Sequence, residues 1–199
     1  KDVEDAKTLA KRFDIRTKLI DLTKIYNQLI KILPKANRLT YANLKARLRM
    51  VILYYFANRF NYLVCGTSNK SELMTGYFTK FGDGASDILP IGDLLKTEVR
   101  KLAEELNIPD FVIKKVPSAG LWQGQSDEKE LGIIYEKLDK ILDGLENKKR
   151  INIEKEKIRQ VKKMIKNSEH KRTGTRICKI KMEVSKNGWD IRNFRKQCA

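Results

Sequence analysis

The chain of 199 residues lacks the features that mark several broad classes of protein. No run of apolar residues approaches 18, which excludes a membrane-spanning helix of the usual kind. The first residues, KDVEDAKTLAKRF, are charged and contain no apolar core, so a secretory signal is not indicated. At 41% hydrophobic residues the composition is that of a folded domain, and the length suits one domain better than two.

Cysteine and histidine are scarce. The three cysteines, Cys65, Cys178 and Cys198, form no CxxC pair, and the one histidine is His170. An odd number of cysteines without ligand spacing argues against a disulfide framework and against zinc. We therefore expect reduced cysteines in a cytoplasmic protein, with Cys65 as a small core residue.

Two common phosphate-binding motifs are also missing. The sequence contains neither a glycine loop ending in Gly-Lys-Ser/Thr nor a GxGxxG segment, and FGDGASD supplies a single GxG pair. Taken alone, Gly82 and Gly84 indicate a turn, because glycine readily adopts positive φ. The functional alternative is a close approach of the backbone to a ligand.

The formal net charge of +17 is large, and it favours polyanionic partners. Residues 170–199 carry nine Lys and Arg against Glu183 and Asp190, a net +7. Elsewhere Lys alternates with Glu, as on solvated helix faces. Without an aromatic-rich platform, nucleic acid is an unlikely partner, and a nucleic-acid-binding protein would have to show steeply salt-dependent binding.

Helical and strand patterns alternate along the chain, which predicts a parallel sheet with helices on both faces. Three strands are readable, at Ile15–Leu22, Tyr62–Gly66 and Ile88–Ile91. Helices are expected over 2–13, 25–33, 40–58, from about 70, 94–106 (with Asp93 as N-cap), 109–115, 131–145 and 154–166. Three strands are few for such a sheet, so a first βα unit is expected to be missing.

The stretch from Tyr62 to Lys96 is where we expect a ligand, because ligands of open α/β sheets bind beyond the carboxyl ends of the strands. Thr67 and Ser68 follow a strand and suit either an anion or a helix N-cap. Glu72 suits either a helix dipole or Mg²⁺.

Three basic residues outside this stretch have open assignments. Arg47 and Arg49 lie in a helix among apolar neighbours, where one of them could reach an anionic ligand. His170 stands beside Lys171 and Arg172, and such a histidine is usually a capping or surface residue. A contact to a nucleotide phosphate is the alternative.

Four segments, in this order, resemble the ammonia-dependent NAD synthetases of the N-type ATP pyrophosphatase group. They are NLKARLRM (Asn43–Met50), LVCGTSNKSELMTGYFTKFGDGASDILPIGDLLKTEVR (Leu63–Arg100), KVPSAGLWQGQSDEKELGIIYEKLD (Lys115–Asp139) and EHKR (Glu169–Arg172). The resemblance covers roughly residues 1–172. It implies a three-layer α/β fold with a parallel sheet, Rossmann-like and of the adenine-nucleotide-hydrolase type.

The resemblance also implies a ligase activity. ATP would adenylylate deamido-NAD with release of pyrophosphate, and ammonia would then displace AMP to give NAD. The implied ATP-binding residues are Thr67, Lys96 and Ser118, and the implied Mg²⁺ ligand is Glu72. The implied deamido-NAD-binding residues are Arg47, Lys80, Asp87, His170 and Lys171. No protein nucleophile is needed, since catalysis would rest on positioning and charge neutralisation.

Residues 1–199 depart from the family pattern in two places. They contain neither the family's first strand nor its SGGxDS phosphate loop, so we expect residues 1–172 to be an N-terminally truncated synthetase-like domain with impaired activity on its own. Residues 173–199 form an atypical, basic and proline-free tail. The resemblance further implies a homodimer joined through the helix Thr40–Asn58. The alternative hypothesis is an inactive partner subunit that binds pyridine nucleotide.

Overall fold

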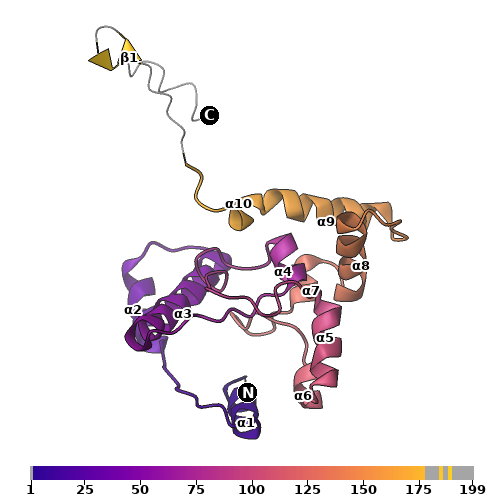
Figure 1. Ribbon diagram of the computed structural model, residues 1–199. Helices are drawn as coiled ribbons and strands as arrows, with labels where there is room; N and C mark the ends of the chain where they lie inside the picture. The colour runs from indigo at the N-terminus through magenta and orange to yellow at the C-terminus, as the bar shows by residue number, and fades with distance from the viewer. Residues whose placement is uncertain (1, 178–183, 186–187, 190–199) are drawn as a thin grey trace.

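A computed structural model of the chain describes residues 2–177, 184–185 and 188–189 (Figure 1). Of the predicted tail 173–199, only 173–177 and the short antiparallel pair β1 (Val184–Ser185) and β2 (Gly188–Trp189) fall within this part. Cys178 and Cys198 lie outside it. Within the described residues, no helix is both long enough and apolar enough to cross a membrane.

The N-terminal part of the chain is helical, as its sequence predicts. Three helices follow one another, α1 (Asp2–Arg12), α2 (Thr23–Ile32) and α3 (Arg38–Phe60). Helix α3 begins because the Asn37 side chain accepts a hydrogen bond from the backbone of Thr40 at 2.9 Å, and it ends where Asn61 turns left-handed at φ 53°. The predicted strand Ile15–Leu22 is wrong: this segment forms neither helix nor strand.

The other two predicted strands meet at a single parallel bridge, between Cys65 and Ile88. Backbone hydrogen bonds hold the bridge, from Gly66 N to Ile88 O at 2.9 Å and from Asp87 N to Val64 O at 2.9 Å. The two segments are therefore neighbours and parallel, although neither is a full strand. Cys65 is exposed, which corrects its prediction as a core residue: within the described residues, no layer covers its side of the bridge.

The rest of the described chain contains the helices α4 to α10. Helix α5 starts at Lys96, so Asp93 is not its N-cap; Asp93 instead forms an ion pair with Lys70 at 3.0 Å. The helix predicted over 131–145 begins later, at Tyr135, because Gly132 ends a preceding short helix at φ +65°. The bounds are α4 (Lys70–Thr75), α5 (Lys96–Glu105), α6 (Asp110–Ile113), α7 (Asp127–Leu131), α8 (Tyr135–Glu146), α9 (Lys155–Asn167) and α10 (Glu169–Arg172).

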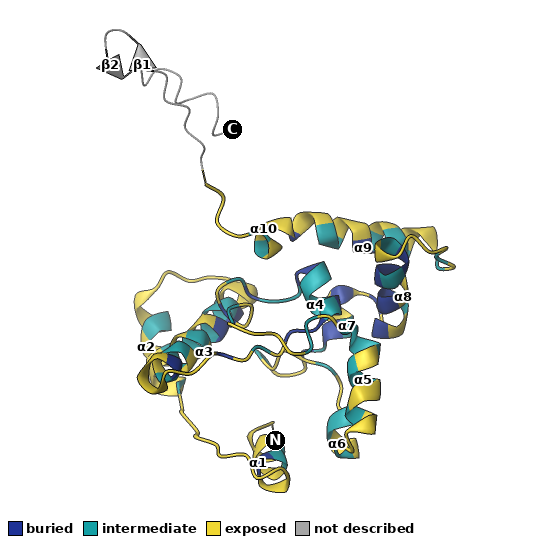
Figure 2. Ribbon diagram, viewed as in Figure 1, coloured by how far each residue is buried: buried dark blue, intermediate teal, exposed yellow. Residues whose placement is uncertain are grey.

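The hydrophobic core lies where α8 packs against α4, α5 and α9 (Figure 2). Helix α8 contributes residues that recur on one face at helical spacing, and α9 adds one from the opposite side. The fully buried side chains are Tyr135, Leu138, Ile141, Leu142 and Val161. Because each such side chain stabilises the fold by about 1.5–3 kcal/mol, this cluster is the main support of α4 and α5.

Helices α2 and α3 pack on each other and expose much of their apolar surface. Figure 2 shows them largely in yellow and teal, in contrast to α8. The exposed large apolar side chains on these helices include Ile25, Ile32, Val51, Leu53, Tyr55 and Phe60. An apolar surface of this extent is typical of a protein interface.

Candidate functional site

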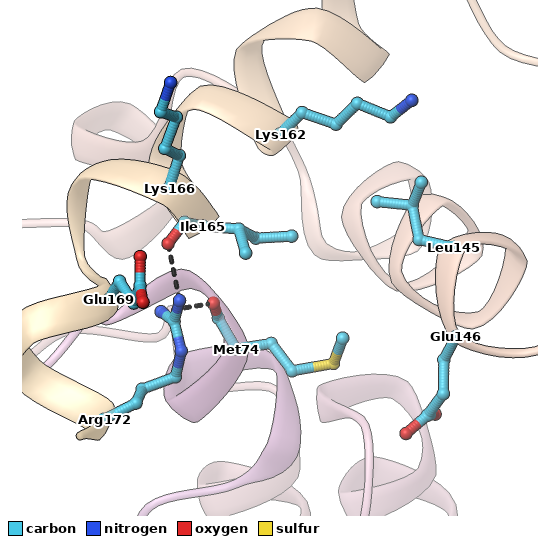
Figure 3. Close-up of a pocket in the computed structure, with 8 residues that line it drawn as sticks. All are labelled: Met74, Leu145, Glu146, Lys162, Ile165, Lys166, Glu169 and Arg172. Atoms are coloured by element: carbon cyan, nitrogen blue, oxygen red, sulfur yellow. Dashed lines mark hydrogen bonds between the residues drawn. The ribbon is translucent and has the colours of Figure 1, made fainter. Parts of the chain in front are cut away.

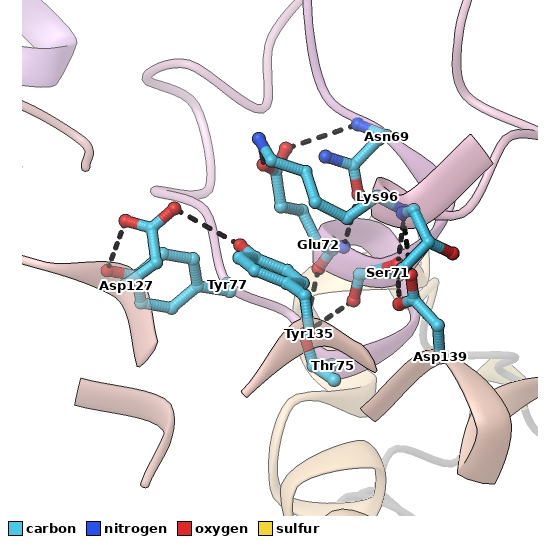
Figure 4. Close-up of polar contacts among 10 residues, drawn as sticks. Asn69, Ser71, Glu72, Thr75, Tyr77, Lys96, Asp127, Tyr135 and Asp139 are labelled. Carbon is cyan, nitrogen blue, oxygen red and sulfur yellow. Dashed lines mark hydrogen bonds and ion pairs between the residues drawn. The ribbon is translucent and has the colours of Figure 1, made fainter. Parts of the chain in front are cut away.

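The centre of the site is Glu72, at the start of α4. The helix opens with a capping box: Asn69 accepts a hydrogen bond from Glu72 N at 3.0 Å, and Glu72 Oε2 accepts one from Asn69 N at 3.1 Å. This reciprocal pair fixes the carboxylate at the positive end of the helix dipole. The other oxygen, Oε1, lies 3.6 Å from Lys96 Nζ (Figure 4). The sequence placed these residues 24 positions apart, and the fold makes them an ion pair.

Burial dominates the electrostatics of this ion pair. The Glu72 side chain is 17% exposed and that of Lys96 is 22% exposed. Loss of water raises the pKa of Glu72, while the Lys96 ammonium and the Asn69 hydrogen bonds oppose the rise. Lys96 is therefore the nearest compensation for this buried carboxylate, and a bound cation would be a second one.

Two tyrosines extend the cluster behind Lys96. The Lys96 ammonium lies 5.5 Å from the centre of the Tyr135 ring, within range of a cation–π contact. The Tyr135 hydroxyl donates to Asp127 at 3.1 Å. The Tyr77 hydroxyl lies 3.1 Å from the other oxygen of Asp127 and 2.5 Å from Glu130.

Tyr77 lies between two acids and has a single hydrogen to donate. A phenol has one hydrogen, yet the Tyr77 oxygen touches carboxylate oxygens of both Asp127 and Glu130. The hydroxyl can therefore donate to only one of them at a time. Burial raises the pKa of Asp127, and the hydrogen bonds from Tyr135 and Tyr77 oppose the rise. Sequence reasoning missed this group; the only signal was the concentration of acids in SDEKEL.

The basic residues predicted for the dinucleotide lie together where α10 approaches α3 and α4. Arg47 Nη2 donates to the backbone oxygen of Lys80 at 3.3 Å. Lys80 Nζ donates to the backbone oxygens of His170 and, at 3.3 Å, of Thr173. Lys171 Nζ donates to two carbonyls of the 76–78 turn, each at 2.8 Å. The side chains of Arg47, Lys80 and Lys171 and the backbone of His170 are thus brought into one region.

Lys171 is half-buried, whereas His170 is exposed. Removal from water lowers the pKa of Lys171, and Asp83 partly offsets the effect. The His170 ring is exposed, with Nδ1 3.2 Å from Asn167 O, so in this structure it is a surface residue at a helix end.

Asp87 lies beside α3, where it contacts Tyr54. Its Oδ2 accepts a hydrogen bond from Val64 N at 2.7 Å, and its Oδ1 accepts one from the Tyr54 hydroxyl at 3.3 Å. Tyr54 and Arg47 are seven residues apart, two helical turns, and so occupy one face of α3. The loop carrying Lys80 and Asp87 therefore runs along this face.

Thr67 and Ser118 are both exposed, on loops. Ser118 Oγ accepts a hydrogen bond from Gly120 N at 3.2 Å. Within the described part of the chain, no hydrogen bond joins either hydroxyl to Lys96. The structure thus pairs Lys96 with Glu72 and leaves both hydroxyls available at the surface.

The donor set at Glu72 fits Mg²⁺ only as a partner of phosphate. Among the described residues, no group of three or more His, Cys, Asp or Glu could hold a metal by itself. Mg²⁺ commonly takes one or two carboxylates and completes its shell with water and substrate phosphates. Glu72 offers one hard oxygen, Oε1, that faces a lysine rather than a backbone donor, and this suits such a shared site.

A separate hollow of about 570 Å³ lies between α4, α8, α9 and α10 (Figure 3). Its lining combines apolar side chains with long charged ones, namely Met74, Leu145, Glu146, Lys162, Ile165, Lys166, Glu169 and Arg172. None of the predicted site residues lines it. Arg172 closes one side by donating to the backbone oxygens of Met74 at 2.9 Å and Ile165 at 2.5 Å.

Comparison with solved structures gives the same fold throughout the matched region. An NMN synthetase from Francisella tularensis superimposes with a TM-score of 0.81 and 38% identity, over 88% of this chain and 72% of that one. An NH3-dependent NAD synthetase from Campylobacter jejuni, solved with nitrate, gives 0.76 and 32% identity, over 89% of this chain and 72% of that one.

Sequence comparison agrees. The NH(3)-dependent NAD(+) synthetase of Archaeoglobus fulgidus is 48% identical over 180 residues, which span 90% of this chain and 72% of that protein. The synthetase of Methanocaldococcus jannaschii is 50% identical over 184 residues, 87% of this chain and 71% of that protein. The model of the NAD synthase family matches residues 1–175. The chain therefore belongs to the NAD synthase family.

Proposed function

We propose that this chain catalyses the ATP-dependent amidation of deamido-NAD with ammonia, giving NAD, AMP and pyrophosphate through an adenylylated intermediate. The observation that supports this most strongly is the half-buried pair of Lys96 and Glu72 at the first turns of two helices, in a chain of this family. A cation beside a hard carboxylate is what a polyphosphate and its metal require. The named relatives do not favour the alternative of an inactive binding subunit.

On the ATP side, Lys96 would neutralise the charge that develops as pyrophosphate leaves. Its ammonium is largely removed from water, so its interaction with phosphate is stronger than at an open surface. The exposed hydroxyls of Thr67 and Ser118 would orient the nucleotide by hydrogen bonds. Glu72 would hold Mg²⁺, which supplies charge neutralisation at the phosphates when bound.

On the dinucleotide side, the cluster of Arg47, Lys80, His170 and Lys171 would bind the phosphates of deamido-NAD. Lysine and arginine at close range are the usual partners of phosphate oxygens. Asp87 contacts Tyr54, two turns along α3 from Arg47, and would accept hydrogen bonds from hydroxyl or amide groups of the pyridine nucleotide half.

The second step needs no nucleophile from the protein. The lone pair of ammonia forms the new C–N bond at the acyl carbon, the C–O bond to AMP breaks, and a proton leaves the nitrogen. The side chains would hold the two reactants at the right distance and orientation, and such positioning by itself accounts for a large share of the rate.

The finer architecture follows the same proposal. Segments 62–66 and 88–91 would be neighbouring strands of a three-layer parallel sheet, which the Cys65–Ile88 bridge supports. Residues 1–172 would form the synthetase domain and 173–199 a separate tail, in the cytoplasm. The exposed apolar surface of α2 and α3 supports a homodimer joined there. Sedimentation of the wild-type chain beside Tyr55→Glu tests this: the wild type should run as a dimer and the variant as a monomer.

One assay tests the activity. The purified chain is incubated with deamido-NAD, ATP, Mg²⁺ and ammonium, and NAD, AMP and pyrophosphate are measured together with binding of each substrate by calorimetry. Equal amounts of the three products support the proposal. Binding of deamido-NAD with no ATP turnover would favour the inactive subunit instead. Because one structural neighbour is an NMN synthetase, the same assay with the mononucleotide substrate decides between the two amide products.

A further inference from the structure

Asp139 is a carboxylate buried in the core of the molecule, at the middle of α8. It is 3% exposed, and both of its oxygens accept hydrogen bonds (Figure 4). Oδ1 accepts from the Ser71 hydroxyl at 2.5 Å, and Oδ2 accepts from Thr97 N at 2.8 Å. The Ser71 oxygen in turn accepts from Lys96 N at 2.9 Å. A buried charge of this kind survives only when its partners are well placed, and here they are.

These hydrogen bonds cap the N-terminus of α5 from outside that helix. The residue before α5 is Leu95, whose side chain has no oxygen to accept a hydrogen bond. The backbone N–H groups of Lys96 and Thr97 therefore find acceptors on α4 and α8 instead. A negative charge at this end also complements the helix dipole. The start of α5 is thus fixed by a residue that is remote in the sequence.

The same carboxylate also fixes the start of α4. Ser71 immediately precedes Glu72, and it is fully buried. Helix α8 packs against both α4 and α5, so Asp139 stands between the two first turns that carry Glu72 and Lys96. The 3.6 Å separation of the Lys96 and Glu72 side chains therefore depends on a third residue that touches neither charged group in the described contacts.

We propose that Asp139 is a positioning residue for the polyphosphate half of the site: through Ser71 and the first turn of α5 it sets Lys96 against Glu72, so that both meet ATP and its metal. This rests on the proposed function. Asp139 touches no substrate group in this account and acts only through its two neighbours.

An ionised carboxylate satisfies both contacts of Asp139. It presents two acceptor oxygens and no donor, which matches one hydroxyl and one N–H group. In Asp139→Asn the amide can accept from Thr97 N, but its NH₂ group then faces Ser71 Oγ, and the hydroxyl hydrogen loses its acceptor. In Asp139→Ala both acceptors are lost. The conservative variant should therefore keep part of the function that alanine abolishes.

The first measurement needs no ligand. Lysines of the full chain are dimethylated with ¹³C, and the Lys96 signal is assigned with Lys96→Arg. Asp139→Ala and Ser71→Ala should shift this signal, and Asp139→Asn should shift it less. Asp143→Asn is the matched control, because Asp143 lies on the same helix and its carboxylate also accepts side-chain hydrogen bonds, from Asn147 and Lys149, but is 37% exposed. A Lys96 signal unchanged in all the Asp139 and Ser71 variants overturns the proposal.

The second measurement is the dissociation constant of MgATP, and of deamido-NAD as reference, by calorimetry. Loss of a residue that orients a ligating group typically weakens binding by about tenfold to a hundredfold, and we expect this for MgATP in Asp139→Ala. Asp139→Asn should lose roughly threefold to tenfold, the worth of one hydrogen bond. The affinity for deamido-NAD should not change. Equal losses for both ligands would show a general structural role and refute the proposal.

A double-mutant cycle with Lys96→Ala provides the decisive control. If Asp139 acts through Lys96, the effect of Asp139→Asn on MgATP binding vanishes once Lys96 is gone. Additive effects contradict the proposal. If the wild-type chain binds MgATP but the Asp139 variants bind it equally well, the positioning role fails and the proposed function stands. If the wild-type chain binds neither substrate, the proposed function fails, and the positioning role for ATP fails with it, whatever the Lys96 signal shows.

Discussion

We expect any side chain at Gly76 to destabilise the fold by overpacking as well as by backbone strain, and a control can separate the two effects. It ends α4 with φ +69°, and a Cβ added there would lie 2.1 Å from Ser168 Cβ and 2.5 Å from Ser168 Oγ. Ser168 cannot yield, because it is buried, its hydroxyl donates to Met164 O at 2.7 Å, and Arg172 donates to that hydroxyl at 2.6 Å.

Gly132 is the matched control. It has nearly the same backbone, φ +65°, but an added Cβ meets only the end of the Gln160 side chain at 3.0 Å, which can move. Left-handed strain costs about 1–2 kcal/mol in both Gly76→Ala and Gly132→Ala. Overpacking against Ser168 adds about 1–3 kcal/mol in the first only. We therefore expect Gly76→Ala to lower the free energy of unfolding by about 2–5 kcal/mol, and Gly132→Ala by about 1–2 kcal/mol.

Urea unfolding of the two variants measures the difference, and calorimetry with deamido-NAD measures its effect on the site. Lys171 donates to Gly76 O at 2.8 Å, so a displaced Gly76 also displaces Lys171, which we propose binds the dinucleotide. Gly76→Ala should weaken deamido-NAD binding, and Gly132→Ala should leave it unchanged. Equal destabilisation by the two substitutions would refute the reasoning, since it would mean that Ser168 gives way.

Three further predictions concern the cluster around Lys96. Lys96→Met should weaken MgATP binding by at least about tenfold in calorimetry, because the proposed phosphate contact is lost. It should also lower stability in urea unfolding, because Glu72 then keeps an uncompensated charge, and adding Glu72→Gln should restore that stability. Tyr77→Phe should lower the free energy of unfolding by about 1–3 kcal/mol, because the partly buried acids lose a hydrogen-bond partner; an unchanged midpoint in urea would contradict this. Burial raises the pKa values of Glu72 and Asp127, so above their ordinary values of 4.5 and 3.8 the folded state binds more protons than the unfolded state. The free energy of unfolding should therefore fall as pH rises from about 4.5 through the raised pKa values. Asp127→Asn should weaken this dependence on pH. A free energy of unfolding that rises with pH over this window in the wild type would contradict the reasoning.

The helices were predictable from sequence because their signals are local. Asn37 as N-cap and the spacing of apolar residues define α3 within its own segment. Strands depend on partners elsewhere in the chain, and so the alternation in Ile15–Leu22 predicted a strand that does not form. The burial of Cys65 failed for the same reason: a strand pattern does not say whether a layer covers it.

The site residues show the same difference between local signals and contacts made across the fold. The residue types in the Tyr62–Lys96 stretch, with the family resemblance, named Lys96 and Glu72 as candidates, and the structure pairs them. Asp139 could not be named from the sequence, because its role exists only where three helices meet. Asp93 shows the converse: its position suited an N-cap, but an ion pair with Lys70 holds it elsewhere.

The cations beside α10 have a further consequence for how tightly the dinucleotide can be held. Lys80 and Lys171 already donate to carbonyl oxygens of the protein itself, those of residues 170 and 173 and of the 76–78 turn. Each ammonium has three N–H groups, and two of them are used in this way. If the dinucleotide binds here as proposed, its phosphates would meet one free N–H group on each lysine and would compete with the backbone for the others, and the carbonyls would regain these donors as a product leaves.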